Sequence, residues 1–266
     1  MIIDTHCHLD DARFRDDVDA VITKAYEQGV QGIIIPGADI NDLSYARELS
    51  YRYEHIFFAA GIHPYNHEQY DEKILRSFLK DEKCIAVGEC GLDYFRLPED
   101  VEEKQTEKQR QQVVFAQHIA LAREFKKPLI VHIRDANEDS KQILLKEKAC
   151  EVGGVLHCYN ASKHLLDLAD KGFYFGIGGV LTFKNAKNLV EVLPLIPRDK
   201  LLIETDAPYL TPMPHRGERN EPSYTLLVAA KMAELLNISV TELHNLTSKN
   251  AFSLFKALEK IKLVTI

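Results

Sequence analysis

Histidines and carboxylates recur in this chain directly after short apolar runs, and these residue types are common ligands of transition metals. His6 and His8, at the end of the first run, are separated by one residue. Side chains of an extended segment alternate between two faces, so both imidazoles would lie on one face and Cys7 on the other. Two imidazoles on one face can bind a single cation, although a lone H-x-H pair also occurs in many proteins without a metal.

Four later apolar runs also end in residues that can bind metal, namely Glu89, His132, His157 and Asp206. Together with the H-x-H pair they supply four imidazoles and two carboxylates, a set that suits zinc, manganese or iron better than calcium. A single histidine after a strand is usually an ordinary hydrogen-bonded residue. The recurrence of such residues after five separate runs favours one shared metal site. The remaining histidines are expected to have no part in it, apart from His63 and His215: His55, His67, His118, His164 and His244.

The apolar runs are expected to be β-strands with helices between them. The predicted strands are Met1–Thr5, Gly32–Pro36, Ile56–Gly61, Ile85–Glu89, Leu129–Ile133, Gly154–Cys158, Phe173–Gly178 and Leu201–Thr205. The predicted helices are Asp17–Gln28, Asn41–Tyr53, Glu103–Phe125, Ala136–Glu147, Ser162–Ala169 and Asn185–Val192. This repeated alternation predicts an α/β protein with a parallel (β/α)8 TIM barrel, while a doubly wound sheet remains an alternative. In a barrel the carboxyl ends of all strands open onto one face, which would bring the candidate ligands together.

The chain changes character after the eighth predicted strand. Residues 207–222 contain four prolines and are expected to form a long structured loop. Two extra helices are predicted at the C-terminus, Ser223–Leu236 and Val240–Leu258, the second with Ser239 as its N-cap. The charge-dense run 96–112 is expected to be the solvated start of a helix, with Pro98 in the first turn. No linker is evident, so residues 1–266 are expected to form a single domain.

Composition excludes several classes of protein. The 266 residues include 33 Lys and Arg against 40 Asp and Glu, a net charge of −7, which argues against binding nucleic acid through overall positive charge. Metal ions could supply positive charge locally. The odd count of five cysteines without a C-x-x-C pair predicts reduced thiols, and Cys7, Cys90 and Cys158 are expected to pack toward the helices. No signal peptide or membrane-spanning segment is evident, so a cytoplasmic protein is expected.

Seven motifs occur in order between Asp4 and Pro222, namely DTHCHLD, GIHP, GECGLDY, KPLIVHIRDA, GGVLHCY, LLIETDAPYL and HRGERNEP. In this combination the chain resembles the TatD-related metal-dependent nucleases of the amidohydrolase superfamily. The resemblance implies a hydrolase that cleaves phosphodiester bonds of DNA with two divalent metal ions (Mg²⁺, Mn²⁺ or Zn²⁺), often as a 3′–5′ exonuclease.

The resemblance also assigns roles to the candidate ligands. His6, His8 and Asp206 would hold one metal ion, and His132 and His157 a second, with Glu89 bridging the two. Asp206 would in addition accept the proton of the attacking water. Asp206 and Glu89 are therefore the expected catalytic residues.

Five residues are expected on the substrate side of the site. Glu204 and Arg134 are each two residues from a candidate ligand, so strand alternation would turn them toward the same site. His63, Arg216 and Asn220 resemble substrate-side positions of the family. The guanidinium groups suit phosphate oxygens, although pairing of the arginines with neighbouring acids remains an alternative.

Other functions remain open on the same barrel. The alternative is metal-dependent hydrolysis of a non-nucleic-acid ester or amide, including aminoacyl-ester deacylation. Many superfamily relatives bridge their metals with a modified Lys on the fourth strand, whereas this chain has Glu89 there, which favours the nuclease. A binding protein without activity is disfavoured because all six ligands are present.

The expected partner is DNA, single-stranded or frayed. Its bases could stack on aromatic side chains near the strand ends, namely Tyr65, Tyr94, Phe95, Tyr159 and Tyr209. No obligate protein partner is expected.

Overall fold

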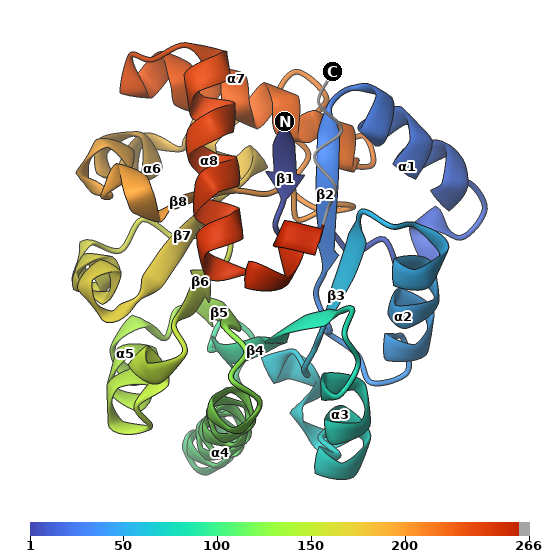
Figure 1. Cartoon of the computed structure of the whole chain (residues 1–266). Coiled ribbons are helices and arrows are strands. Elements are labelled where there is room, and N and C mark those ends of the chain that lie inside the picture. The colour runs from blue at the N-terminus through green and yellow to red at the C-terminus, as the bar shows by residue number, and fades with distance from the viewer. Residues whose placement is uncertain (261–266) are drawn as a thin grey trace.

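Eight parallel strands form the centre of the molecule in the computed structural model, which describes residues 1–260 (Figure 1). The strands are β1 (Ile2–Asp4), β2 (Val30–Ile35), β3 (Ile56–Ala60), β4 (Cys84–Asp93), β5 (Leu129–Arg134), β6 (Gly154–Leu156), β7 (Phe173–Ile177) and β8 (Leu201–Ile203). Neighbours in sequence are neighbours in the sheet. Between β8 and β1 the ring is nearly closed by the Thr5 amide, which donates to the Ile203 carbonyl at 3.1 Å. The predicted (β/α)8 barrel is confirmed.

The strands are apolar on both faces because each face packs against protein. Ile34, Phe57 and Ile130 belong to a cluster inside the barrel, which α8 (Val240–Leu254) covers from one end with Ala251 and Leu254. The alternate strand residues face outward and pack against the surrounding helices in a second, larger cluster. This double burial explains why the strands were recognisable as short apolar runs.

The other helices are α1 (Val18–Glu27), α2 (Leu43–Arg52), α3 (Glu72–Leu79), α4 (Val101–Phe125), α5 (Asn137–Lys146), α6 (Lys187–Val192) and α7 (Thr225–Leu236). The sequence analysis missed α3, which begins after Asp71, whose side chain accepts a hydrogen bond from the Ile74 amide. The segment 162–169, expected to be a helix, lies in 3-10 turns over Lys163–Lys171. The last predicted helix is divided, since α8 ends at Leu254 and a 3-10 segment, Lys256–Lys260, follows.

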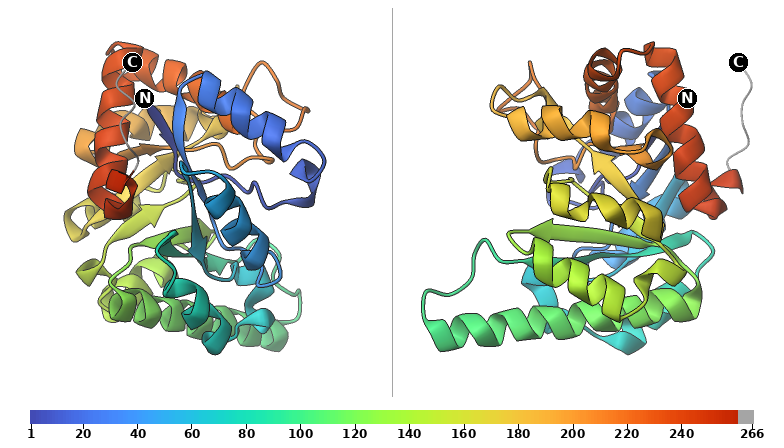
Figure 2. Two further views of the ribbon diagram at one scale, coloured as in Figure 1. Left: turned by 45° about the vertical axis from the view of Figure 1, so that its right-hand side comes forward. Right: turned by 90° about the vertical axis from the view of Figure 1, so that its left-hand side faces the viewer.

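Helix α4 projects beyond the barrel at its N-terminal end, on the side opposite to α8 (Figure 2). It begins at Val101 because the Asp100 side chain accepts hydrogen bonds from the amides of Glu102 and Glu103, at 2.9 Å each. Pro98, expected in the first turn, therefore lies outside the helix. Since α4 follows β4, its projecting end marks the side onto which the strands' carboxyl ends open.

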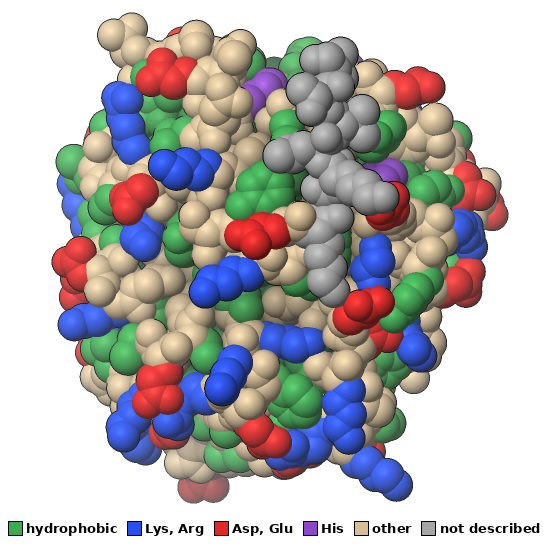
Figure 3. Space-filling view, viewed as in Figure 1, with side chains coloured by type: hydrophobic (Ala, Val, Ile, Leu, Met, Phe, Trp, Pro, Cys, Tyr) green, Lys and Arg blue, Asp and Glu red, His purple; other side chains and the backbone are tan. Residues whose placement is uncertain are grey.

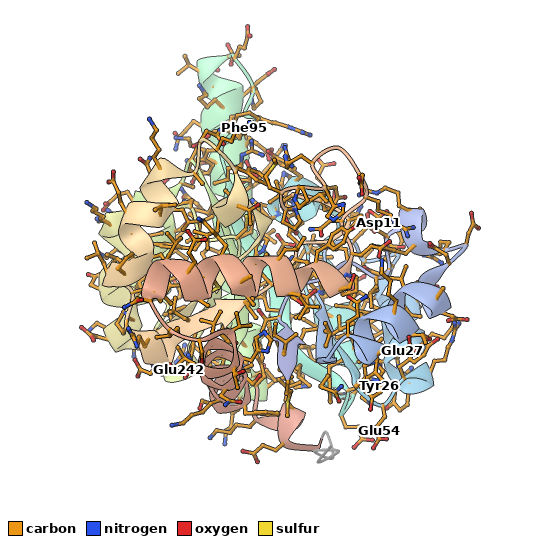
Figure 4. The ribbon with its side chains drawn as sticks, turned by 90° about the horizontal axis from the view of Figure 1, so that it is seen from above. Asp11, Tyr26, Glu27, Glu54, Phe95 and Glu242 are labelled. Carbon is orange, nitrogen blue, oxygen red and sulfur yellow. The ribbon has the colours of Figure 1, made fainter. Side chains whose placement is uncertain are left out.

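The two ends of the barrel differ in what they display. The end covered by α8 shows lysines and arginines interspersed with acidic side chains (Figure 3). Phe95 lies beside the projecting end of α4 and Asp11 lies in the same half of the molecule, whereas Glu54 and Glu242 lie in the other half (Figure 4). None of the helices within residues 1–260 is long and apolar enough to cross a membrane.

Candidate metal centre

The six predicted ligand residues converge at the carboxyl ends of the strands. Five of them line a cavity of about 830 Å³ at this end of the barrel, namely His8, Glu89, His132, His157 and Asp206. His6 lies beneath them and is fully buried. The barrel thus brings together side chains that are up to 200 positions apart in the chain.

The first group of ligand atoms surrounds Oε2 of Glu89. That oxygen lies 3.4 Å from His6 Nε2 and 3.7 Å from His8 Nε2. Asp206 Oδ1 lies 3.6 Å and 3.5 Å from the same two nitrogens. These separations leave room for one ion between the four side chains.

The second group surrounds the other oxygen of the same carboxylate. Glu89 Oε1 lies 2.9 Å from His132 Nδ1 and 3.1 Å from His157 Nε2, and these two nitrogens are 3.3 Å apart. His63 Nε2 approaches the same oxygen at 3.8 Å. Each oxygen of Glu89 therefore faces a different pair of histidines, which is the arrangement of a carboxylate able to bridge two cations.

The chemistry of this donor set fits divalent metal ions. His6 Nε2 and His8 Nε2 point at each other across 3.2 Å, so at least one lone pair needs a proton or a cation. Three groups of ligand atoms each lie within 4.8 Å of one another: His6, His8 and Asp206; His6, Glu89 and His157; and His63, Asp93 and His132. Nitrogen and carboxylate oxygen ligands at this spacing suit zinc, manganese or iron.

The ionisation of Glu89 and Asp206 is set by their burial and by the histidines that contact them. Burial alone would raise the pKa of Glu89, but His157 and His6 outweigh burial and hold it well below its usual value. Burial would likewise raise the pKa of Asp206, whereas its hydrogen bond with His8 lowers it. Both carboxyl groups are therefore ionised at neutral pH and available as metal ligands.

His63 lies at the edge of the second group. Its Nδ1 accepts a hydrogen bond from the Tyr65 amide at 3.1 Å, so the proton of the neutral ring is on Nε2, which faces Glu89. Burial lowers the pKa of His63 to about 4, which keeps the ring neutral. The ring can therefore donate a hydrogen bond into the cavity.

Two further carboxylates lie behind the histidines of the second group. Asp93 Oδ2 lies 2.9 Å from His132 Nε2 and accepts its proton, so that Nδ1 is turned toward Glu89. The Tyr65 hydroxyl donates to the other Asp93 oxygen at 2.7 Å. Partners of this kind fix the orientation of a ligating ring. Sequence reasoning did not single out Asp93, although it is four residues from Glu89 on the same strand, on the face that alternation would assign to the ligand.

Glu204 is the second of these carboxylates, and it lies beneath the site rather than in the cavity wall. It is fully buried, accepts a hydrogen bond from the Cys158 amide, and lies 3.4 Å from His157 Nδ1. A Cβ at Gly176 would lie only 2.1 Å from Glu204 Oε2, so this space exists because residue 176 is glycine. The Glu204 side chain lies on the inner side of the barrel, as alternation from Leu202 places it, but beneath the cavity wall.

The remaining substrate-side candidates divide into two pairs. His63 and Arg134 line the cavity. Asn220 is fully buried, and its amide donates to the carbonyls of Thr205 (2.8 Å) and Tyr209 (2.6 Å), which supports the loop after β8. The Arg216 guanidinium lies 4.0 Å from the centre of the Phe183 ring, and Arg216 does not line the cavity. The structure thus places Glu204, Arg216 and Asn220 in contacts within the protein, and substrate contact by these residues stays a prediction.

The flanking cysteines also differ from one another. Cys7 and Cys90 are fully buried, as expected for packing residues, and all five thiols are free of disulfides. Cys158 instead lines the cavity, because the chain leaves β6 at Leu156 and Cys158 has a φ of 44°. The alternation that would turn its side chain toward the helices ends before this residue.

The cavity wall is divided by charge. We call Asp10, Asp11, Asp39 and Asp42, which follow β1 and β2, the acidic sector. Arg96 and Arg134, which follow β4 and end β5, form the basic sector. The wall after β6 and β7 is uncharged and includes Asn160, Val180, Asn185, Asn188 and Leu189. A ligand in this cavity therefore meets opposite charges on different sides of the central carboxylate.

Comparison with known proteins agrees with this geometry. The family model described as "TatD related DNase" matches residues 3–256. The metal-dependent hydrolase YcfH of Escherichia coli K12 is 39% identical over 259 residues, covering 96% of this chain and 95% of that protein. The 3′-5′ ssDNA/RNA exonuclease TatD of Salmonella typhimurium is 33% identical, covering 96% and 99%. The crystal structure of YjjV, a TatD homologue of E. coli K12, superposes with a TM-score of 0.87 at 28% identity, covering 96% and 98%.

Proposed function

This chain belongs to the TatD-related DNase family of metal-dependent hydrolases, and we propose that it is a deoxyribonuclease that removes nucleotides from the 3′ end of DNA with two divalent cations. The observation that carries the proposal is the placement of Glu89, whose two oxygens face two separate pairs of histidines. A phosphodiester is a slow electrophile, and its hydrolysis is the reaction for which paired cations are best suited.

The proposed ligands follow the two groups around Glu89. His6, His8 and Asp206 would hold one cation, and His132 and His157 would hold the other, with Glu89 shared. When bound, such cations bind phosphate oxygens, lower the pKa of a water and neutralise charge on the leaving oxygen. Three of these ligands, His6, Glu89 and His157, are buried and contact one another, which restricts the positions of their side chains.

Asp206 is the proposed proton acceptor. Its side chain is 14% exposed and lines the cavity, whereas Glu89 is 3% exposed, so Asp206 is the carboxylate that an attacking water can reach. It would take the proton of that water and return it to the leaving oxygen. We expect Asp206→Ala to lower the hydrolysis rate by about 10²- to 10⁴-fold, the usual contribution of such a group. Full activity of this variant would exclude the role.

The wall of the cavity supports single-stranded DNA as the substrate. Arg134 and Arg96 offer charge for phosphate oxygens, and His63 offers a ring proton. Tyr65 and Tyr209 line the cavity and can stack unpaired bases, whereas Tyr159 lines it but is buried and packs on Phe175. Tyr94 is instead engaged with Asp139 and Gln112 outside the cavity wall.

The deciding experiment is hydrolysis of an end-labelled single-stranded DNA by metal-stripped protein, with and without Mg²⁺ or Mn²⁺. Progressive shortening from the 3′ end that a chelator abolishes, and that His6→Ala lacks, would establish the nuclease. If metal binds but no oligonucleotide is cleaved, the nuclease proposal fails. Carbon-centred esters and amides, including aminoacylated RNA, would then be the substrates to test on the same site.

A further inference from the structure

One carboxylate of the acidic sector is buried and receives no hydrogen bond from any other described residue. Asp10 is 5% exposed and lines the cavity, and within residues 1–260 no other residue donates a hydrogen bond to its side chain. Its neighbours in the sector are already engaged. Asp11 accepts from Arg13 (2.7 Å), Asp42 from Arg15 (3.2 Å) and Asp39 from Gln69 (3.1 Å).

A buried acceptor that lines a cavity is expected to receive its donor from what fills the cavity. Buried polar groups in proteins are nearly always hydrogen-bonded. Water can supply the donor in the free protein, and a hydroxyl group of a bound substrate can replace that water. An anionic group is a poorer replacement, because it brings acceptor atoms and negative charge beside the carboxylates of Asp11, Asp39 and Asp42.

The basic sector of the cavity wall carries the opposite charge. In the described part of the chain, neither Arg96 nor Arg134 has a carboxylate partner. The Arg134 guanidinium stacks on the Phe95 ring at 3.6 Å, and that of Arg96 lies 5.4 Å from the centre of the Tyr65 ring. Both are held by aromatic rings and keep their donors free for phosphate oxygens. A polynucleotide backbone is therefore attracted to this side and repelled by the acidic sector.

We propose that Asp10 accepts a hydrogen bond from the terminal 3′-hydroxyl of the substrate, so that the site takes hydroxyl-terminated single strands and rejects 3′-phosphate ends. This inference rests on the proposed function. With the scissile phosphate at Glu89, the terminal nucleoside lies toward the acidic sector and the rest of the chain leaves over Arg96 and Arg134. Asp10 is two residues from His8 in the same cavity, and the scissile phosphate and terminal hydroxyl belong to one sugar, so one nucleotide spans the two positions.

The first test uses the unmodified protein with its metal. Single-stranded DNAs of one sequence, ending in a 3′-hydroxyl or a 3′-phosphate, are compared for kcat/KM, and a second pair differs only at the 5′ end. We expect the 3′-phosphate to lower kcat/KM by about 10- to 100-fold, the effect of losing a charged hydrogen bond and gaining repulsion. The 5′ pair should differ little. Equal rates for the two 3′ ends, or discrimination only at the 5′ end, would overturn the inference while leaving the nuclease in place.

The second test assigns the discrimination to Asp10. Asp10→Asn replaces the carboxylate by an amide that can donate to a phosphate, so the ratio of the two rates should fall toward one. The control Asp19→Asn removes the same charge from an exposed residue that lies outside the cavity wall and is paired with Arg52 (2.8 Å), and it should keep the ratio. If Asp10→Asn turns over slowly, fluorescence anisotropy of the same DNAs in Ca²⁺ gives the ratio of their affinities. An unchanged ratio in Asp10→Asn contradicts the inference, and if no DNA is bound or cleaved by the unmodified protein, both proposals fail.

Discussion

At the scale of single residues, the histidines differ in which ring nitrogen faces the centre. His6, His8 and His157 present Nε2, whereas His132 presents Nδ1. The difference arises because Asp93 accepts the Nε2 proton of His132. Sequence motifs indicate which residues are ligands, but the choice of nitrogen depends on a partner that only the folded chain brings into place.

The contact between Asp93 and His132 gives the first prediction. Asp93→Asn keeps the size of the side chain but removes the negative charge that raises the basicity of the ring, so the second cation should bind about 10- to 100-fold more weakly. At limiting metal, the amount bound per chain should fall, as measured by elemental analysis after equilibrium dialysis.

A matched control for this change is Asp139→Asn, because Asp139 also accepts from a tyrosine hydroxyl but belongs to no ligand group. It should bind as much metal as the unmodified protein. If Asp93→Asn binds metal as tightly as the control, Asp93 does not position His132 for metal binding.

At the scale of elements, the strands and the six candidate ligands could be read from the sequence because two simple regularities hold. Strands buried on both faces are apolar runs, and residues at their carboxyl ends share one end of a barrel. The regularity of alternation can be lost where a strand ends. Cys158 has a positive φ, and its side chain consequently lies in the cavity wall, where alternation does not place it.

The loop after β8 shows another limit of sequence reasoning. Arg216 and Asn220 are residue types that suit phosphate recognition, yet a long loop also has backbone carbonyls that need donors. Asn220 supplies two such donors from a fully buried position. Residue type alone does not separate these uses, because the distinction lies in burial.

Helix α4 supports the segment before His63 through a histidine outside the metal centre. His118 Nε2 accepts from the Ile62 amide at 3.0 Å, and its Nδ1 proton is donated to the Val114 carbonyl at 2.8 Å. Both bonds require the neutral ring, and burial lowers the pKa of His118 from 6.5 to about 4. The unfolded chain therefore takes up a proton here as the pH falls below 6.5, while the folded chain does not.

The second prediction follows from that difference in protonation. Because the pKa is lowered in the folded state, the contribution of His118 to the free energy of unfolding is fully present above pH 6.5 and is lost as the pH falls from 6.5 to about 4. The amount lost is on the order of 3 kcal/mol. His118→Gln should be about 1–3 kcal/mol less stable at neutral pH and should lose less stability on acidification. Urea unfolding of both proteins near pH 7 and pH 5 measures the difference. An equal acid-induced loss in both proteins would contradict the prediction, and the exposed His164→Gln is the control.

At the scale of the whole molecule, a net charge of −7 repels DNA, so the proposed substrate has to be attracted by positive charge within the cavity. The arginines of the acidic side, Arg13 and Arg15, are paired with carboxylates, whereas Arg96 and Arg134 have no such partner among residues 1–260. The cavity therefore offers phosphate groups only a few cations in addition to bound metal. The affinity of such a protein for DNA should depend on salt concentration far less than that of a nucleic-acid-binding protein with a broad basic surface.

This contrast is the basis of the last prediction. Each phosphate neutralised on a single strand contributes about −0.7 to the slope of log affinity against log salt concentration, so two arginine contacts predict a slope near −1.4. The slope is obtained from kcat/KM for single-stranded DNA at saturating Mg²⁺, with KCl varied between about 50 and 200 mM. Arg134→Gln should make the slope shallower by about 0.7, whereas Arg110→Gln, an exposed change on α4, should leave it unchanged. A slope several times steeper would mean that the strand follows a wider basic surface than the two arginines of the cavity, and an unchanged slope in Arg134→Gln would remove that residue from the path of the phosphates.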